Sequence, residues 1–272
     1  MVNYAVRWAL VLALGAAVVP AAAQTQEFVP EVGQPGKDVV WVPSPPETVE
    51  KMMEVGRITP QDFVIDLGSG DGRNVIAAAK RGARGLGVEY NNDMVELSKR
   101  IADKEGVAQR AQFVQGDMFQ ADFSKATVLA LFLLPSNLLQ LRDKILDLQP
   151  GTRVVLNTFG IQDWTPDEQV TLENCTSWCT VMLNIVPAKV EGTWKLPQGE
   201  LTLSQQYQMV TGTMKYSDGR TVPVNGRLRG YDITLTGDDK QEFKGRVNGK
   251  TLEGTARTSN GQASAVTLTK IS

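Results

Sequence analysis

The stretch Asp66-Leu67-Gly68-Ser69-Gly70-Asp71-Gly72 decides the fold of this 272-residue chain. It closes the apolar run 63–67, which is typical of a buried strand, and it precedes the helix-forming residues 73–81. Three glycines at alternate positions allow a tight turn and let a ligand approach the backbone closely. The N-terminus of the following helix adds the positive end of its dipole. Strand, turn and helix in this order predict an α/β unit with a ligand site at the end of the strand.

The same alternation continues to residue 158. We expect further strands at 85–89, 111–115, 127–133 and 152–157, and helices from Pro46 to about Val55, at 93–105 and at 136–147. Strands separated by helical stretches predict a Rossmann-like, doubly wound, mostly parallel sheet with helices on both faces.

The sequence pattern changes after about residue 187, and no helical periodicity follows. Short β-type runs recur at 192–196, 200–206, 209–216, 220–224, 231–236, 241–247, 250–257 and 263–270. Turn signals separate them, among them Asn225-Gly226 and Asn248-Gly249, which tolerate positive φ. We therefore expect a smaller all-β antiparallel domain, a barrel or a sandwich, at 190–272. The Rossmann-like domain is expected at 39–187, after a linker at 24–38.

Residues 1–23 are typical of a secretory signal peptide. Arg7 precedes the uncharged stretch 8–19, Pro20 ends it, and Ala21-Ala22-Ala23 offers a cleavage site. Twelve helical residues span about 18 Å, less than the roughly 30 Å bilayer core. We expect an exported protein, periplasmic or secreted, with no stable membrane span after cleavage. The alternative is an uncleaved N-terminal anchor.

Cys175 and Cys179 are the two cysteines of the chain. An exported protein meets an oxidising compartment, where a local disulfide can form if the segment is not a regular strand. In a strand the two residues would lie about 13 Å apart, too far to bridge. The spacing leaves both alternatives open.

Composition restricts the chemistry. The sequence has no histidine, which excludes Ser–His and Cys–His nucleophile pairs and histidine-ligated zinc, and a lone C-x-x-x-C pair is a poor metal site. We expect no bound metal. The net charge of −2 gives no electrostatic case for nucleic acid, so none is expected as a partner.

Three acids follow successive strands of the predicted sheet. Asp66 precedes the glycines, which suits a ligand with a cationic group, and Glu89 can accept hydrogen bonds from both hydroxyls of a ribose. Asp117 can accept from an exocyclic amine, with apolar neighbours against a purine. Carboxyl ends of adjacent strands are where open α/β sheets bind ligands.

With Asp66–Arg73, Glu89 and Gly116-Asp117-Met118-Phe119, the sequence resembles the class I, seven-strand S-adenosylmethionine-dependent methyltransferases. More narrowly, Val42-Pro43-Ser44-Pro45 and Leu131-Phe132-Leu133-Leu134-Pro135 resemble bacterial relatives of the lysine methyltransferases that act on the ATP synthase c subunit. The resemblance covers residues 39 to about 187. The predicted export and the C-terminal β domain lie outside it.

The resemblance implies S-adenosylmethionine as cofactor and methyl transfer to an amine, such as a protein lysine or a small molecule. The implied cofactor-binding residues are Asp66, Gly68, Ser69, Gly70, Gly72, Glu89, Tyr90, Asp117 and Met118. The predicted substrate-channel residues are Trp41, Pro43, Phe132, Leu134, Pro135 and Asn137, with Trp164 also bordering the site. No general base can be named. The alternative is an exported, non-catalytic module that binds a nucleoside or another ligand, with the β domain engaging a partner.

Overall fold

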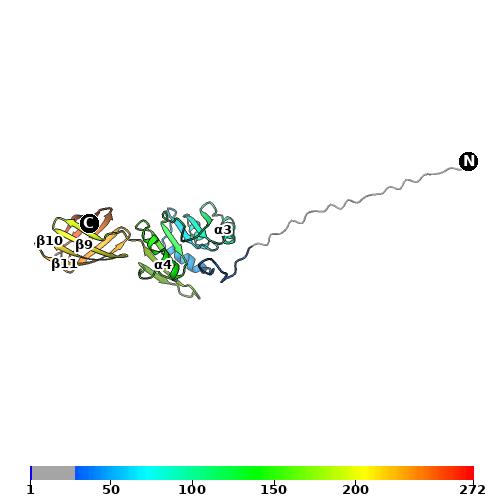
Figure 1. The fold of residues 1–272 in the computed structure, drawn as a ribbon, viewed down its shortest axis with the longest axis horizontal. Coiled ribbons are helices and arrows are strands. Elements are labelled where there is room, and N and C mark those ends of the chain that lie inside the picture. The colour runs from blue at the N-terminus through cyan, green and yellow to red at the C-terminus, as the bar shows by residue number, and fades with distance from the viewer. Residues whose placement is uncertain (2–27) are drawn as a thin grey trace.

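The computed structural model describes residue 1 and residues 28–272. Residues 2–23 of the predicted signal peptide and residues 24–27 of the predicted linker therefore lie outside the described residues. Figure 1 shows two folded parts in chain order: a helix-bearing part coloured blue to green and an all-β part coloured yellow to red.

The first part contains a seven-stranded sheet in the order β3-β2-β1-β4-β5-β7-β6. Five strands run parallel, while β7 pairs antiparallel with β5 and with β6. The strands are β1 (Phe63–Leu67), β2 (Arg84–Glu89), β3 (Ala111–Gln115), β4 (Val128–Leu131), β5 (Arg153–Asn157), β6 (Glu168–Thr171) and β7 (Thr180–Ile185). The helices are α1 (Pro46–Val55), α2 (Arg73–Lys80), α3 (Asn92–Lys104) and α4 (Pro135–Leu146). The Rossmann-like prediction is confirmed.

Strand β4 shows why the sheet is covered on both faces. All four of its residues are buried, and successive side chains point to opposite faces. Val128 and Ala130 pack with side chains of α1 and α2, whereas Leu129 and Leu131 pack with side chains of α4. A strand buried on both sides has no polar position, which explains its uninterrupted apolar sequence.

The second part is a closed antiparallel barrel of eight strands in the order β10-β11-β12-β13-β14-β15-β8-β9. The strands are β8 (Gly192–Leu196), β9 (Gly199–Gln206), β10 (Met209–Tyr216), β11 (Thr221–Arg229), β12 (Asp232–Gly237), β13 (Glu242–Asn248), β14 (Thr251–Arg257) and β15 (Ala263–Lys270). Trp194 is fully buried in its core, and its indole N–H donates to the carbonyl of Val190 at 2.8 Å. Inward-facing apolar side chains fill the barrel, as its eight strands allow.

The prediction of a turn at Asn225-Gly226 is wrong. Both residues lie inside β11 and pair with strands on either side. A Cβ at Gly226 would lie 2.3 Å from the carbonyl oxygen of Thr234, so glycine permits a close approach of two strands there. The turn comes later, at Gly230, where φ is 61°.

Trp164 connects the sheet to the barrel instead of bordering the site. Its side chain is 1% exposed and stacks on Tyr207, with ring centroids 5.6 Å apart. Tyr207 forms the β9–β10 turn with φ of 53°, and the side-chain amide of the neighbouring Gln208 donates to the carbonyl of Thr165 at 2.7 Å. The ion pairs Arg227–Asp167 and Arg229–Glu168 flank this contact.

This interface predicts how the two parts behave when separated. We expect fragments 24–187 and 190–272 each to unfold cooperatively, because each has its own buried core. Fragment 24–187 should melt several degrees below the intact chain, since Trp164 loses its cover. Calorimetry of the two fragments and the whole chain measures this. Failure of both fragments to fold would mean that the two parts share one core.

Candidate functional site

A cavity of about 240 Å³ lies at the carboxyl ends of the parallel strands. Its walls come from the ends of β1 to β5 and from the N-terminal segment 34–42. A smaller cavity of about 40 Å³ is lined by the loop after β1. Trp41, Val42, Gly68 and Phe132 line both cavities, so the two adjoin there.

The loop between β1 and α2 turns by adopting left-handed backbone conformations. Gly68, Gly70 and Gly72 have φ of 74°, 55° and 80°. A Cβ at Gly70 would lie 2.7 Å from the indole nitrogen of Trp41, so glycine also lets the segment 34–42 close over the loop. At Gly72 a Cβ would collide with Phe113 at 2.5 Å, on the side of the sheet core.

Asp66 is the penultimate residue of β1, lines the smaller cavity and is 3% exposed. Burial raises the pKa of its carboxyl well above the ordinary value, and the nearby Glu89 and Asp71 carboxylates raise the pKa further. The side-chain amide of Asn74 donates to Asp66 at 3.1 Å and opposes that shift. A cationic group placed here would stabilise the ionised carboxylate.

Two buried polar atoms beside Asp66 have no hydrogen-bond partner within the protein. They are Oγ of Ser69 and Oδ1 of Asn74, and both residues line the smaller cavity. Buried polar groups are normally satisfied, so unpartnered atoms in a cavity indicate a place for a polar ligand. An acceptor beside a buried carboxylate suits a ligand that donates hydrogen bonds, such as an ammonium group.

Glu89 ends β2 and holds the glycine loop in place. Its carboxylate accepts from the backbone N–H of Gly70 at 2.9 Å and of Asn91 at 3.0 Å. The next residue, Tyr90, is half exposed at the rim of the larger cavity. The prediction that Glu89 faces the ligand cleft agrees with its place in the cavity wall.

Asp117 follows β3 and forms an ion pair with Lys37 at 2.6 Å. The Lys37 ammonium and the backbone N–H of Phe119 lower the pKa of Asp117. Lys37 also lies over the ring of Tyr90, 5.3 Å from its centroid. Asp117, the acid expected to contact a purine, thus holds Lys37 of the predicted linker in place. The end of that linker therefore forms part of the cavity wall.

The structure brings most of the predicted residues to the two cavities. Asp66, Gly68, Ser69, Gly70, Glu89, Tyr90, Asp117 and Met118 line one cavity or the other, as do Trp41, Pro43, Phe132 and Leu134. Gly72, Pro135 and Asn137 line neither. Gly72 faces Phe113, Pro135 begins α4 on the surface, and Asn137 is buried within the first turn of that helix.

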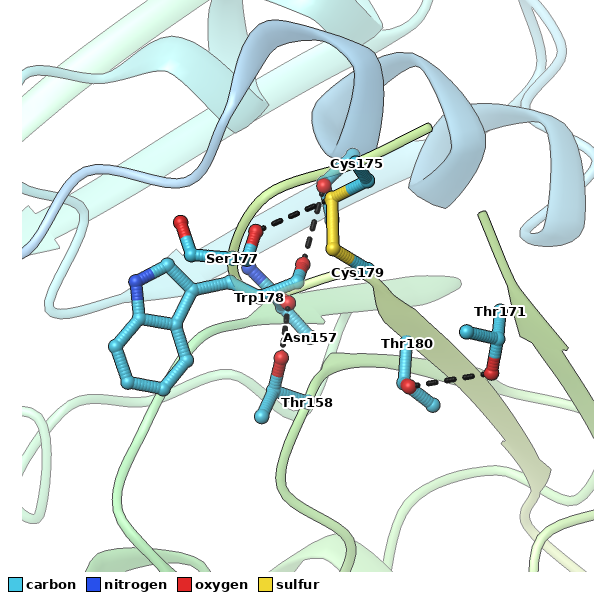
Figure 2. Close-up of a disulfide and its surroundings, with 9 residues drawn as sticks. Asn157, Thr158, Thr171, Cys175, Ser177, Trp178, Cys179 and Thr180 are labelled. Atoms are coloured by element: carbon cyan, nitrogen blue, oxygen red, sulfur yellow. Dashed lines mark hydrogen bonds between the residues drawn. A yellow bond between two sulfur atoms is a disulfide. The ribbon is translucent and has the colours of Figure 1, made fainter. Parts of the chain in front are cut away.

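Sequence reasoning missed Phe159 and Trp178. Both line the larger cavity beside Phe132, with ring centroids 5.4 to 6.2 Å apart in the three pairs. Trp178 belongs to the β6–β7 loop, which the disulfide Cys175–Cys179 closes, with Cα atoms 5.7 Å apart (Figure 2). The one sequence feature that marks Trp178 is its position between two cysteines, which can close a loop around it.

Comparison with known proteins agrees with this geometry. The family model described as the ANTKMT methyltransferase domain matches residues 66–168. A protein-lysine N-methyltransferase of Saccharolobus islandicus (strain REY15A) is 38% identical over 151 residues, which cover 54% of this chain and 94% of the relative. The Homo sapiens lysine N-methyltransferase named for the ATP synthase c subunit is 36% identical over 128 residues, 47% of this chain and 54% of the relative. The chain belongs to this family of class I methyltransferases.

A solved structure of similar fold contains a cofactor product. The RNA methyltransferase of Salinibacter ruber, in complex with S-adenosyl-L-homocysteine, is 43% identical, with a TM-score of 0.52. The match covers 55% of this chain and 96% of that one. The methyltransferase uses S-adenosylmethionine. The buried Asp66 and the unpartnered atoms of Ser69 and Asn74 fit the ammonium and carboxylate of a methionine moiety, and Glu89 fits a ribose.

The methyltransferase should show a pH-dependent affinity for S-adenosylhomocysteine through Asp66. Because the pKa of the free carboxyl is raised, a bound ammonium group favours its ionised form and binding releases a proton. Affinity should therefore increase as pH rises toward that pKa. In Asp66→Asn this dependence should disappear and affinity should fall at least tenfold, as loss of a charged hydrogen bond implies.

The same substitution should not destabilise the unliganded methyltransferase. A raised carboxyl pKa means that the folded state binds more protons than the unfolded state, so stability falls as pH rises above the unfolded pKa. Asp66→Asn removes that cost, and its melting temperature at neutral pH should equal or exceed that of the wild type. The exposed Asp103→Asn serves as control. Titration calorimetry with an unchanged affinity in Asp66→Asn would contradict the assignment.

Proposed function

We propose that this methyltransferase methylates the side-chain amine of lysine in a protein. The observation that carries the proposal is the match to the Saccharolobus islandicus protein-lysine N-methyltransferase over 94% of that relative. The human relative is likewise named for a lysine acceptor. The family model spans residues 66–168, which include Asp66, Glu89 and Asp117 of the cavities.

The reaction is a displacement at one carbon. Bound S-adenosylmethionine supplies a methyl group activated by a positively charged sulfonium. The neutral amine donates its lone pair to form the C–N bond while the C–S bond breaks and its electron pair stays on sulfur. The amine must release one proton before attack, because a protonated lysine has no lone pair.

The acids of the cavities are already engaged, so they are poorly placed to take that proton. The acidic residues that line the cavities are Asp38, Asp66, Asp71, Glu89 and Asp117. Asp38 and Asp117 pair with Lys37, Asp71 pairs with Arg73, and Glu89 accepts from two backbone N–H groups. Asp66 is buried and accepts a hydrogen bond from the side-chain amide of Asn74. We therefore propose that the proton passes to water and that the site contributes position and exclusion of bulk water.

This proposal predicts a simple pH profile. With the acceptor lysine near its ordinary pKa of about 10.4, kcat/KM for a lysine-containing peptide should rise about tenfold per pH unit between pH 7 and 9. Steady-state kinetics at saturating cofactor measures the profile. A plateau starting near pH 7 would contradict the loss of a proton to water from a lysine of ordinary pKa.

The alternative methyl acceptor is RNA, because the Salinibacter ruber structure is described as an RNA methyltransferase. The net charge of −2 gives little attraction for a polyanion. We expect mass spectrometry to find methylated lysine in a lysine-rich peptide incubated with cofactor and no methylated nucleotide in a parallel RNA sample. The reverse result would overturn the lysine acceptor, and the Asp66→Asn variant is the inactive control for both samples.

We also propose that the methyltransferase works outside the cytosol, in the periplasm or after secretion. The signal-like sequence 1–23 and the Cys175–Cys179 disulfide both support an oxidising compartment. Within residues 28–272 no helix has the length and apolar character needed to cross a bilayer.

The location can be tested on protein isolated from its own cells. We expect the mature chain to begin at Gln24 and both cysteines to resist alkylation until a reductant is added. N-terminal sequencing and mass spectrometry after alkylation give both results. An intact N-terminus would favour the retained anchor, and two alkylated cysteines would favour a cytosolic enzyme.

A further inference from the structure

Three aromatic side chains from distant parts of the chain meet in the wall of the larger cavity. Phe132 follows β4, Phe159 follows β5, and Trp178 lies in the β6–β7 loop. All three are half-buried, and every pair is in ring contact, with centroids at 5.4, 5.9 and 6.2 Å. We call these three residues the aromatic wall.

The aromatic wall adjoins the place where the two cavities meet. Phe132 lines both cavities, whereas Phe159 and Trp178 line only the larger one. Asp66 and the glycine loop line the smaller cavity, and Asp117 and Tyr90 line only the larger one. In the cofactor the sulfonium joins the methionine part to the nucleoside part. The junction, and with it the aromatic wall, therefore suits the reacting methyl group and the acceptor.

Two residues of the wall depend on unusual backbone conformations. Trp178 has φ of 57°, which is rare for a bulky side chain. Thr158, directly before Phe159, has φ of 60°, and the N–H of Phe159 donates to the carbonyl of Asn157 at 2.6 Å. Such conformations cost free energy, persist only where the surroundings enforce them, and concentrate at ligand sites.

The surroundings enforce the position of Trp178 from two directions. The disulfide Cys175–Cys179 closes the loop that carries it, and the hydroxyl of the buried Thr48 in α1 donates to its carbonyl at 3.1 Å. In Figure 2 the indole ring extends away from the disulfide, on the other side of the loop. The loop therefore presents the ring to the cavity.

We propose that the aromatic wall binds the side chain of the acceptor lysine, and that Trp178, held by the disulfide loop, is the residue that sets acceptor affinity. This inference rests on the proposed lysine methylation. Aromatic faces attract cations, so the wall stabilises the positive charge that develops on the amine nitrogen as the C–N bond forms. Its apolar rings also pack against the four methylene groups of lysine.

Binding of a lysine analogue to the protein loaded with S-adenosylhomocysteine tests the inference without catalysis. The probe is Nα-acetyl-lysine methylamide, compared with the uncharged Nα-acetyl-norleucine methylamide, and NMR titration reports affinity. The lysine probe should bind more tightly than the norleucine probe. Trp178→Ala should weaken the lysine probe about tenfold, whereas Trp178→Phe should retain most of the affinity.

A second variant separates the disulfide from the ring. Cys175→Ser/Cys179→Ser keeps Trp178 but releases the loop, so lysine-probe affinity should fall in the same direction by a smaller factor. Ser177→Ala, an exposed loop residue, should behave as the wild type. Affinity for S-adenosylhomocysteine should change less than twofold in all four variants.

The outcomes distinguish this inference from the proposed function. Wild-type protein that fails to bind S-adenosylhomocysteine would overturn the cofactor site and both proposals with it. Cofactor binding without lysine-probe binding, or equal lysine-probe affinity in Trp178→Ala, would overturn the aromatic wall alone. Parallel loss of cofactor and probe affinity in Trp178→Ala would show that the residue only supports the fold.

Discussion

The left-handed backbone at Gly68, Gly70 and Gly72 is the constraint on which the site depends. It turns the chain from β1 into α2 within five residues, so that Asp66 and the N-terminus of α2 face the same small space. Glu89 from β2 accepts from Gly70 and fixes the loop to the neighbouring strand. Any side chain at Gly70 would collide with Trp41 and would also strain the backbone, so the loop and the segment that covers it are coupled.

The sequence was sufficient to predict the parallel sheet, the helices and the acidic residues at the strand ends. β1 to β5 are short segments rich in apolar residues that alternate with helical stretches, and the carboxyl ends of parallel strands necessarily meet at one edge. Asp66, Glu89 and Asp117 therefore came together by topology alone. The barrel strands were also predictable, because alternation and turn residues mark them, except where Gly226 serves strand packing instead of a turn.

The aromatic wall and the strands that support it were not predictable in the same way. β6 is four residues long and largely exposed, so it carries no periodic apolar pattern. Phe159 and Trp178 reach the cavity through positive φ at Thr158 and Trp178, residue types that do not favour this conformation. Tertiary contacts overrule local preference there. The cysteine spacing was compatible with a disulfide or a strand, and the β6–β7 turn decided between them.

The β6–β7 hairpin is held at both ends, and the barrel holds one of them. The barrel therefore helps to position the part of the cavity wall that this hairpin forms. At one end Asp167 and Glu168 pair with Arg227 and Arg229 of β11, and at the other the disulfide loop carries Trp178. The two arginines are about half exposed, so solvent screens these ion pairs. The stacking of Trp164 on Tyr207 and the Gln208 amide bond to Thr165 hold the barrel against this edge more firmly, because the side chains of Trp164 and Gln208 are buried from water. An antiparallel edge hairpin is otherwise the least supported element of the sheet, and here it forms one side of the cavity. Fixing its outer end to a separately closed barrel limits how far the aromatic loop at its inner end can move.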